Sequence, residues 1–237
     1  MAKTVNVETI DGTMKLYEAR PAAAPRGAVV VIQEAFGVND HIEDIARRFA
    51  AEGFLAVAPH LFHRSGDATI AYDDMAAVMP HIMALTPEGL EADLDAAIAH
   101  VKDQGLELGQ IGVVGFCMGG SVAFLAAAHR TLGAAVTFYG GGVTEGRFGM
   151  PPLLDLAPGL KTPWLGLFGD RDQSIPVEQV EALREAVKAA SVAADIVRYP
   201  DADHGFHCDA RDSYHASSAE DAWRRTLDWF TGHLGAP

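Results

Sequence analysis

The sequence predicts an α/β protein with a mostly parallel central sheet and helices on both faces. Short apolar runs rich in β-branched residues alternate along the chain with segments whose apolar residues have helical spacing. Segments that carry Glu34, Cys117, Asp172 and His204 each follow a predicted strand. Because parallel strands end at the same edge of a sheet, we expect these four segments to form a site there.

The composition fits one globular domain that spans residues 1–237, since 49% of the residues are hydrophobic and 21% are charged. The N-terminus has polar residues where a signal peptide would be apolar, and no run is long enough to span a membrane, which predicts a cytoplasmic protein. The net charge of −14 argues against nucleic acid or an anionic membrane as a partner. We expect a monomer or a small homo-oligomer.

The chain opens with a predicted antiparallel edge. The segments Val5–Ile10 and Met14–Ala19 alternate between apolar and polar residues, and Asp11-Gly12 between them is a hairpin signal. A Pro/Ala connector follows, and Ala28–Ile32 is then apolar throughout. A continuous apolar run of this kind predicts an interior strand, buried on both faces of a parallel sheet.

A helix, a strand and an irregular segment are predicted next. Asn39 or Asp40 can cap a helix that ends at Gly53. The pattern then weakens over residues 60–83, where a helical composition is interrupted at Pro80. We expect this segment to form the wall or the lid of a pocket.

Helices and strands alternate through the rest of the chain. Thr86-Pro87 predicts a helix start, because threonine caps a helix and proline suits its first turn. The tandem prolines Pro151 and Pro152 lie in a predicted loop excursion over residues 140–161. Including the first part of the chain, the predicted strands are 5–10, 14–19, 28–32, 54–58, 111–114, 134–139, 164–168 and 195–199. The later helices are predicted near 87–101, 121–129, 177–190 and 217–233.

The hexapeptide Gly115-Phe116-Cys117-Met118-Gly119-Gly120 is the strongest chemical signal. It joins a predicted strand to a predicted helix, and glycines on both sides of Cys117 permit the strained turn of a nucleophile elbow. A thiol at a helix N-terminus gains thiolate character from unpaired N–H groups. A buried structural cysteine is the alternative, because free cysteine is among the most buried residue types.

A cysteine nucleophile needs a base, and the base needs a group that orients it. Cys117, Asp172 and His204 follow one another in the nucleophile–acid–histidine order of the α/β-hydrolase fold. Asp170 is a rival acid, but it stands directly against the end of a predicted strand. We therefore expect a triad of Cys117, His204 and Asp172.

Four motifs together resemble the dienelactone hydrolases, or carboxymethylenebutenolidases, from about residue 5 to residue 233. The motifs are Gln33-Glu34-Ala35-Phe36-Gly37-Val38-Asn39, the hexapeptide at 115–120, Asp172-x-x-Ile175-Pro176 and His204-Gly205-Phe206. The resemblance implies an α/β-hydrolase fold, a Cys-His-Asp triad, an acyl-enzyme mechanism and no cofactor. It further implies that the substrate is a small lactone or ester.

The resemblance also assigns roles around the nucleophile. It implies that Glu34 lies beside the resting thiol and helps convert it to thiolate when substrate binds; a carboxylate satisfied by backbone N–H groups is the alternative. The oxyanion hole is expected from the backbone N–H groups of Met118 and Ala35. Tyr72 and Phe36 are expected to contact the substrate.

The chain departs from the resembled family at two arginines that hold a substrate carboxylate. The corresponding stretches, residues 66–72 and 204–208, contain no arginine, although Arg64 lies close enough in sequence to substitute. A substrate carboxylate that enters an apolar pocket loses its hydration, and without a cation in the pocket no ion pair offsets that loss. We therefore expect a preference for neutral lactones or short activated esters.

Two other interpretations of the sequence remain. The first is a zinc site, because histidine, cysteine and aspartate side chains can ligate zinc. These residues lack the helix-borne glutamate that a metallohydrolase uses as a base, so we predict no metal. The second is a ligand-binding or thiol-sensing domain without turnover. The candidate metal ligands are His60, His63, His204, His207, Cys208, Asp209 and His215.

Overall fold

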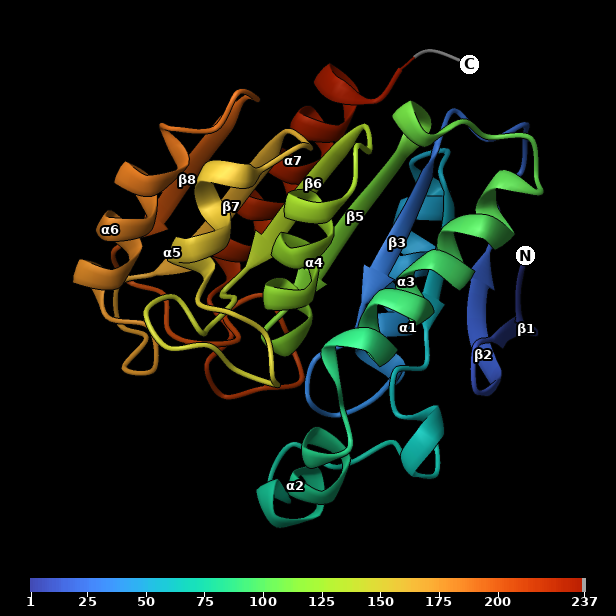
Figure 1. Ribbon diagram of the computed structural model, residues 1–237, viewed down its shortest axis with the longest axis horizontal. Helices are drawn as coiled ribbons and strands as arrows, with labels where there is room; N and C mark the ends of the chain where they lie inside the picture. The colour runs from blue at the N-terminus through green and yellow to red at the C-terminus, as the bar shows by residue number, and fades with distance from the viewer. Residues whose placement is uncertain (236–237) are drawn as a thin grey trace.

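The computed structural model describes residues 1–235, so the last two residues of the predicted domain lie outside the description. One sheet holds eight strands in the order β1-β2-β4-β3-β5-β6-β7-β8 (Figure 1). The strands are β1 (Ala2–Thr9), β2 (Gly12–Ala19), β3 (Ala28–Ile32), β4 (Leu55–Pro59), β5 (Ile111–Phe116), β6 (Ala134–Phe138), β7 (Trp164–Gly169) and β8 (Ala194–Tyr199). The α-helices are α1 (Asp40–Ala51), α2 (Met75–Met83), α3 (Pro87–Lys102), α4 (Met118–His129), α5 (Leu153–Leu156), α6 (Val177–Val187) and α7 (Ala216–His233). Short 3-10 turns are η1 (His63–Ser65), η2 (Leu108–Gln110) and η3 (Ala157–Gly159).

The predicted fold class is confirmed by the strand pairing. Every neighbouring pair from β4 through β3 to β8 is parallel, whereas β1 and β2 form an antiparallel hairpin that pairs with β4 at one edge. All residues of β3, β4, β5, β6 and β7 are buried, as expected for strands covered on both faces. Their carboxyl ends therefore share one edge of the sheet.

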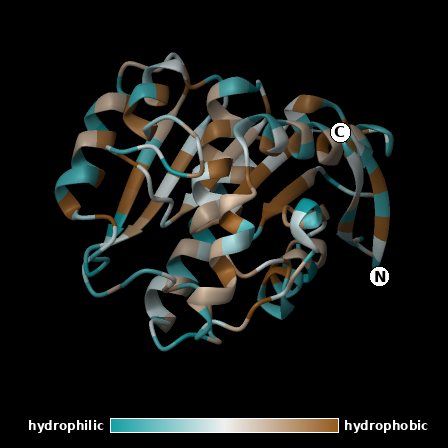
Figure 2. Ribbon diagram, turned by 60° about the horizontal axis from the view of Figure 1, so that its bottom comes forward, coloured by the Kyte–Doolittle hydropathy of each residue, from teal (hydrophilic) through white to brown (hydrophobic). Residues whose placement is uncertain are grey.

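Helices cover both faces of the sheet. On one face α1 packs against α7, with the Phe49 ring centroid 4.6 Å from that of Trp223 and 5.7 Å from that of Phe230. The other face is covered by α3, α4 and α6 (Figure 1). Figure 2 shows helices with both hydrophilic and hydrophobic residues, as this layered arrangement requires. In the described part of the chain, none of the helices combines the length and hydrophobicity that a membrane crossing needs.

Three local predictions differ from the structure. Pro80 was expected to interrupt the helical segment, but it lies inside α2. This helix starts at Met75 and continues three residues past the proline. Helix α4 begins at Met118 rather than near residue 121, so its first turn includes Gly119 and Gly120. The excursion over residues 140–161 is not wholly irregular, since it contains α5 and η3.

Candidate active site

Cys117 occupies a sharp turn between β5 and α4. Its backbone has φ 55° and ψ −117°, a conformation that L-residues rarely adopt. A Cβ atom on Gly115 would lie 1.8 Å from the carbonyl oxygen of Gly119, and one on Gly119 would lie 2.4 Å from that of Gln33. Side chains at either position would collide with backbone, which is the steric reason for the glycines of the predicted elbow.

The structure brings the three predicted triad residues together. His204 Nε2 lies 3.1 Å from Cys117 Sγ, and His204 Nδ1 lies 2.7 Å from Asp172 Oδ2. The other carboxylate oxygen of Asp172 accepts hydrogen bonds from the Ser174 N–H at 2.8 Å and the Ser174 hydroxyl at 2.6 Å. Asp172 thus has partners on both oxygens and can orient the imidazole.

The rival acid Asp170 has a different partner. Both of its oxygens accept from Arg198, at 2.7 Å from Nε and 2.8 Å from Nη2. This bidentate ion pair joins the end of β7 to β8. The geometry therefore favours Asp172 over Asp170 as the partner of His204.

The electrostatics of the triad favour a charged imidazole. Burial opposes a charge on His204, but the neighbouring Cys117 and Asp172 outweigh it and raise the His204 pKa to about 10. Burial would likewise raise the pKa of Asp172, yet the hydrogen bonds from His204 and Ser174 lower it below its ordinary value. This arrangement suits His204 to accept a proton during the reaction.

Glu34 follows β3 and is fully buried. Its Oε1 accepts from Arg211 Nη1 at 3.3 Å, and its Oε2 has no hydrogen-bond partner. The thiol of Cys117 contacts His204 rather than Glu34, so the resting contact implied by the resemblance is not seen here. The alternative, a carboxylate satisfied by backbone N–H groups, is not seen either.

The two expected oxyanion donors lie at element ends. Met118 is the first residue of α4, so its N–H has no acceptor within the helix. Ala35 comes just after β3, and the close approach of Gly119 to the Gln33 carbonyl holds the start of α4 against this strand end. Both N–H groups are therefore at the elbow, where a carbonyl oxygen under attack would need donors.

A cavity of about 600 Å³ opens beside His204 of the triad. Tyr72 lines it, and its hydroxyl accepts from Asn39 Nδ2 at 2.9 Å and from Cys208 Sγ at 3.2 Å. Phe36 packs edge-on against the Tyr72 ring with centroids 4.7 Å apart. The cavity is lined by Tyr72, Asp73, Asp203, His204, Ala210, Arg211, Asp212 and Ser213, so Phe36 supports the lining through Tyr72.

Sequence reasoning missed Arg211. Arg211 lies three residues past the stretch 204–208, and the loop turns back so that its guanidinium faces Glu34. Gly205 makes room, since a Cβ atom there would lie 2.4 Å from Arg211 Nη1. The expectation of a pocket without a guanidinium was therefore wrong.

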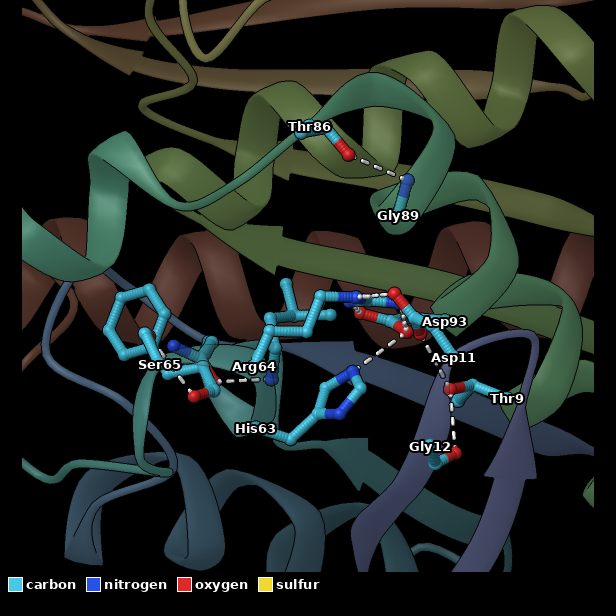
Figure 3. A network of polar contacts seen from close by, with 12 residues as sticks. Thr9, Asp11, Gly12, His63, Arg64, Ser65, Thr86, Gly89 and Asp93 are labelled. Atoms are coloured by element: carbon cyan, nitrogen blue, oxygen red, sulfur yellow. Dashed lines mark hydrogen bonds and ion pairs between the residues drawn. The ribbon is translucent and has the colours of Figure 1, made fainter.

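Arg64, the substitute suggested by the sequence, lies elsewhere. It binds Asp93 through Nη1 at 2.7 Å and Nη2 at 2.9 Å, and Asp11 through Nε at 2.6 Å (Figure 3). It does not line the cavity that holds His204. The ion pairs of Arg64 connect η1, α3 and the β1–β2 turn.

The candidate metal ligands do not form a metal site in the described residues. Within residues 1–235, no three His, Cys, Asp or Glu side chains gather in a way that could hold a metal ion. His60 pairs with Asp67, and His63 with Asp93. His207 is buried with its ring centroid 4.9 Å from that of Phe138, so the sequence cluster does not form a spatial one.

The parallel sheet, the elbow at the end of β5 and the order of the triad residues define an α/β-hydrolase. A family model described as the dienelactone hydrolase family matches residues 14–234. The chain belongs to this family, as its motifs suggested.

Relatives and a solved structure agree with this assignment. An Escherichia coli protein provisionally named carboxymethylenebutenolidase is 43% identical over 227 residues, which cover 94% of this chain and 83% of that protein. The carboxymethylenebutenolidase of Pseudomonas putida is 30% identical over 234 residues, covering 97% and 96%. A crystal structure from Klebsiella pneumoniae, provisionally named dienelactone hydrolase, superposes with a TM-score of 0.90 at 40% identity and covers 98% of this chain and 99% of its own.

Proposed function

We propose that this protein is a carboxylic ester hydrolase that opens lactones or short activated esters through an acyl-enzyme on Cys117. The observation that carries the proposal is the continuous chain of contacts from Asp172 through His204 to the Cys117 thiol, on a strained elbow. The name of the Pseudomonas putida relative supports a lactone as the substrate class. The cavity over His204 is the proposed substrate pocket.

The proposed first half-reaction forms a thioester. His204 Nε2 takes the thiol proton, and Cys117 Sγ attacks the carbonyl carbon. The negative charge that develops on the carbonyl oxygen is received by the N–H groups of Met118 and Ala35. The carbon–oxygen bond to the leaving group then breaks, and the leaving oxygen takes the proton from His204. In a lactone this oxygen remains attached to the acyl chain.

The second half-reaction reverses these roles with water as the nucleophile. His204 takes a proton from water, hydroxide attacks the thioester carbonyl, and the Cys117 thiolate leaves and recovers the proton. Asp172 accepts from the Nδ1–H of His204 throughout and stabilises the imidazolium. The carboxylic acid product loses its proton to solvent.

Glu34 and Arg211 form the second charged pair of the proposed site. The Glu34 carboxylate helps, as a base, to withdraw the proton of the thiol when substrate binds, and Arg211 both balances the buried charge of Glu34 and lines the pocket. A substrate carboxylate would find its guanidinium partner in Arg211. Neutral lactones and short esters are substrates under this proposal, and a carboxylate near the scissile bond improves binding.

The test uses the two cysteines as a matched pair. Cys117 is partly exposed and Cys208 is buried, so stoichiometric iodoacetamide should modify Cys117 first. We expect wild type and Cys208→Ala to hydrolyse p-nitrophenyl acetate and to lose turnover in proportion to alkylation. Cys117→Ala should lose at least about a thousandfold in kcat/KM with its Tm retained.

Two outcomes would contradict the proposal. Full activity after complete alkylation of Cys117 would exclude the thiol as the nucleophile. Absence of turnover with every ester and lactone offered, from a folded wild-type protein whose Cys117 reacts readily, would favour the non-catalytic, thiol-sensing interpretation.

A further inference from the structure

An open groove of about 690 Å³ lies near the amino ends of the parallel strands, away from the triad. It is bordered by the start of β1, by the end of β2 with the connector that follows, and by the last turn of α1. Ala19, at the end of β2, pairs with Ala56 near the start of β4, whereas the triad residues follow the carboxyl ends of the parallel strands. The groove is therefore separate from the Cys117 site, and the proposed function makes no use of it.

The lining of the groove is mostly apolar. Ala19, Pro21, Ala22, Ala50 and Ala51 contribute to it, and none of these side chains carries a polar group. Small-molecule sites in proteins are typically concave and mostly apolar, with volumes of about 300–1,000 Å³ and a few polar groups that fix the ligand. The groove has the size and the surface for a ligand with a hydrocarbon part.

Two arginines, Arg20 and Arg47, provide the only charged side chains that line the groove in the described part of the chain. The protein as a whole has a net charge of −14, so the charge on this groove is opposite to that of the rest of the molecule. A guanidinium can bind a carboxylate through two parallel hydrogen bonds, which makes arginine a specific partner for this anion. The groove therefore complements a ligand that is apolar and negatively charged.

The guanidinium of Arg20 is held in place, and its charge is not fully neutralised. It donates to Glu18 from Nε at 2.7 Å and from Nη2 at 3.1 Å, and Nη2 also donates to Gln104 at 2.8 Å. Lys3 Nζ lies 3.5 Å from the same carboxylate, so two cations face the single charge of Glu18. One positive charge is therefore in excess beside the groove.

Arg47 can exchange its partners more easily. Its side chain is 45% exposed, and its contacts with Glu43 and Asp44 on the same helix are long, at 3.3 and 3.5 Å. Exposed ion pairs of this kind contribute little to stability. Its Nη1 also donates to the Tyr17 hydroxyl at 3.0 Å, which holds the guanidinium near the groove. A ligand carboxylate can replace the two helical carboxylates without leaving a buried charge unpaired.

We propose that this groove binds a small amphipathic carboxylate of the kind represented by a free medium-chain fatty acid. The carboxylate pairs with Arg47 and Arg20, and the hydrocarbon chain covers the alanines of α1 and of the connector after β2. An uncharged chain lacks the ion pair, and a short carboxylate buries little apolar surface, so both parts of the ligand are needed. The inference does not depend on the chemistry at Cys117.

The test is isothermal titration calorimetry of the wild-type protein with octanoate at low ionic strength, because salt screens exposed charges. We expect binding at one site in the groove with a Kd on the order of 1 mM or tighter. Octanol keeps the chain and acetate keeps the charge, and each should bind at least about tenfold more weakly. Arg211→Gln removes the guanidinium beside His204 and should leave the Kd for octanoate unchanged.

Two variants test charge and shape separately. Arg47→Gln keeps the groove and removes a charge, so the Kd should rise by about tenfold. Ala22→Phe fills the groove from an exposed position and should also weaken binding by at least about tenfold. Arg224→Gln is the matched control, because this exposed arginine pairs with Asp221 and Asp228 on its own helix and does not line the groove. It should keep the wild-type Kd, and circular dichroism confirms that each variant is folded.

Several outcomes would overturn the inference. Absence of octanoate binding to the folded wild-type protein would do so, as would equal affinities for octanoate and octanol. Binding that is lost in Arg211→Gln but retained in Arg47→Gln and Ala22→Phe would assign the ligand to the cavity beside His204. A dimer in sedimentation velocity that dissociates in Ala22→Phe would show instead that a second copy of the chain covers the groove.

Discussion

Asp93 and Glu34 are two fully buried carboxylates that each face an arginine, and their surroundings differ. Asp93, on α3, receives both terminal nitrogens of Arg64 at 2.7 and 2.9 Å and lies 3.1 Å from His63 Nε2 (Figure 3). Glu34 has one contact of 3.3 Å, from Arg211, and one oxygen without a partner. The first carboxylate is saturated with partners and the second is not.

We propose that the difference separates a structural carboxylate, Asp93, from a functional one, Glu34. Arg64 also binds Asp11, so the Asp93 cluster connects α3 to η1 and to the turn of the edge hairpin. A buried charge with complete partners stabilises one conformation. The unused oxygen of Glu34 is free to accept a hydrogen bond, which fits its proposed action on the Cys117 thiol. Buried polar atoms without hydrogen-bond partners are expected at such sites.

The largest expected effect is on stability, in Asp93→Asn. The variant keeps the shape and removes the charge that compensates Arg64, and breaking a buried pair of this kind costs about 3 kcal/mol. Tm should fall by roughly 6–12 °C for a domain of this size. The measurement is thermal unfolding followed by circular dichroism. A Tm within about 2 °C of wild type would show that a complete set of hydrogen-bond and ion-pair partners does not identify a structural carboxylate.

Glu34→Gln should show the opposite pattern. We expect kcat/KM to fall by about 10- to 100-fold, or about 1.4–2.7 kcal/mol, because the amide is too weak a base to help withdraw the proton of the thiol. The free energy of unfolding should stay within about 1 kcal/mol of wild type, since the lost ion pair is long and poorly compensated. Steady-state kinetics and thermal unfolding on the same preparation provide both values. A loss of stability equal to that of Asp93→Asn, without loss of activity, would remove the distinction.

The two arginines provide a smaller contrast. Arg211 lines the cavity and Arg64 does not, so Arg211→Gln should reduce the kcat/KM ratio of a lactone carboxylate to its methyl ester by about tenfold, or 1.4 kcal/mol. Arg64→Gln should leave the ratio unchanged while lowering Tm. Both variants are compared on the same pair of substrates. An equal ratio in wild type and Arg211→Gln would mean that this guanidinium serves Glu34 alone.

Local sequence rules were sufficient to predict the sheet and to single out three side chains that contact one another, Cys117, His204 and Asp172. All eight strands were predicted, because buried parallel strands have continuous apolar runs and the edge hairpin alternates. The geometry around Cys117 followed from sterics, since only glycine fits on either side of the turn. The chain order of an α/β-hydrolase then selected Asp172 and His204, which do contact in the structure.

What the sequence did not predict depends on the paths of loops. Arg211 reaches Glu34 only because the loop after β8 turns back over a glycine, and nothing in the local pattern indicates that turn. Asp93 would pass for a surface residue of an amphipathic helix, because its partners come from η1.

Trapping the proposed acyl-enzyme on Cys117 is the most direct test of the proposed mechanism. The protein is mixed with p-nitrophenyl acetate, quenched in acid within the first turnover and digested for mass spectrometry. An acetyl group is expected on the Cys117 peptide of wild type and of Cys208→Ala, and none in Cys117→Ala. Turnover without any acyl group on Cys117, or an acyl group that remains when Cys117 is replaced, would contradict it.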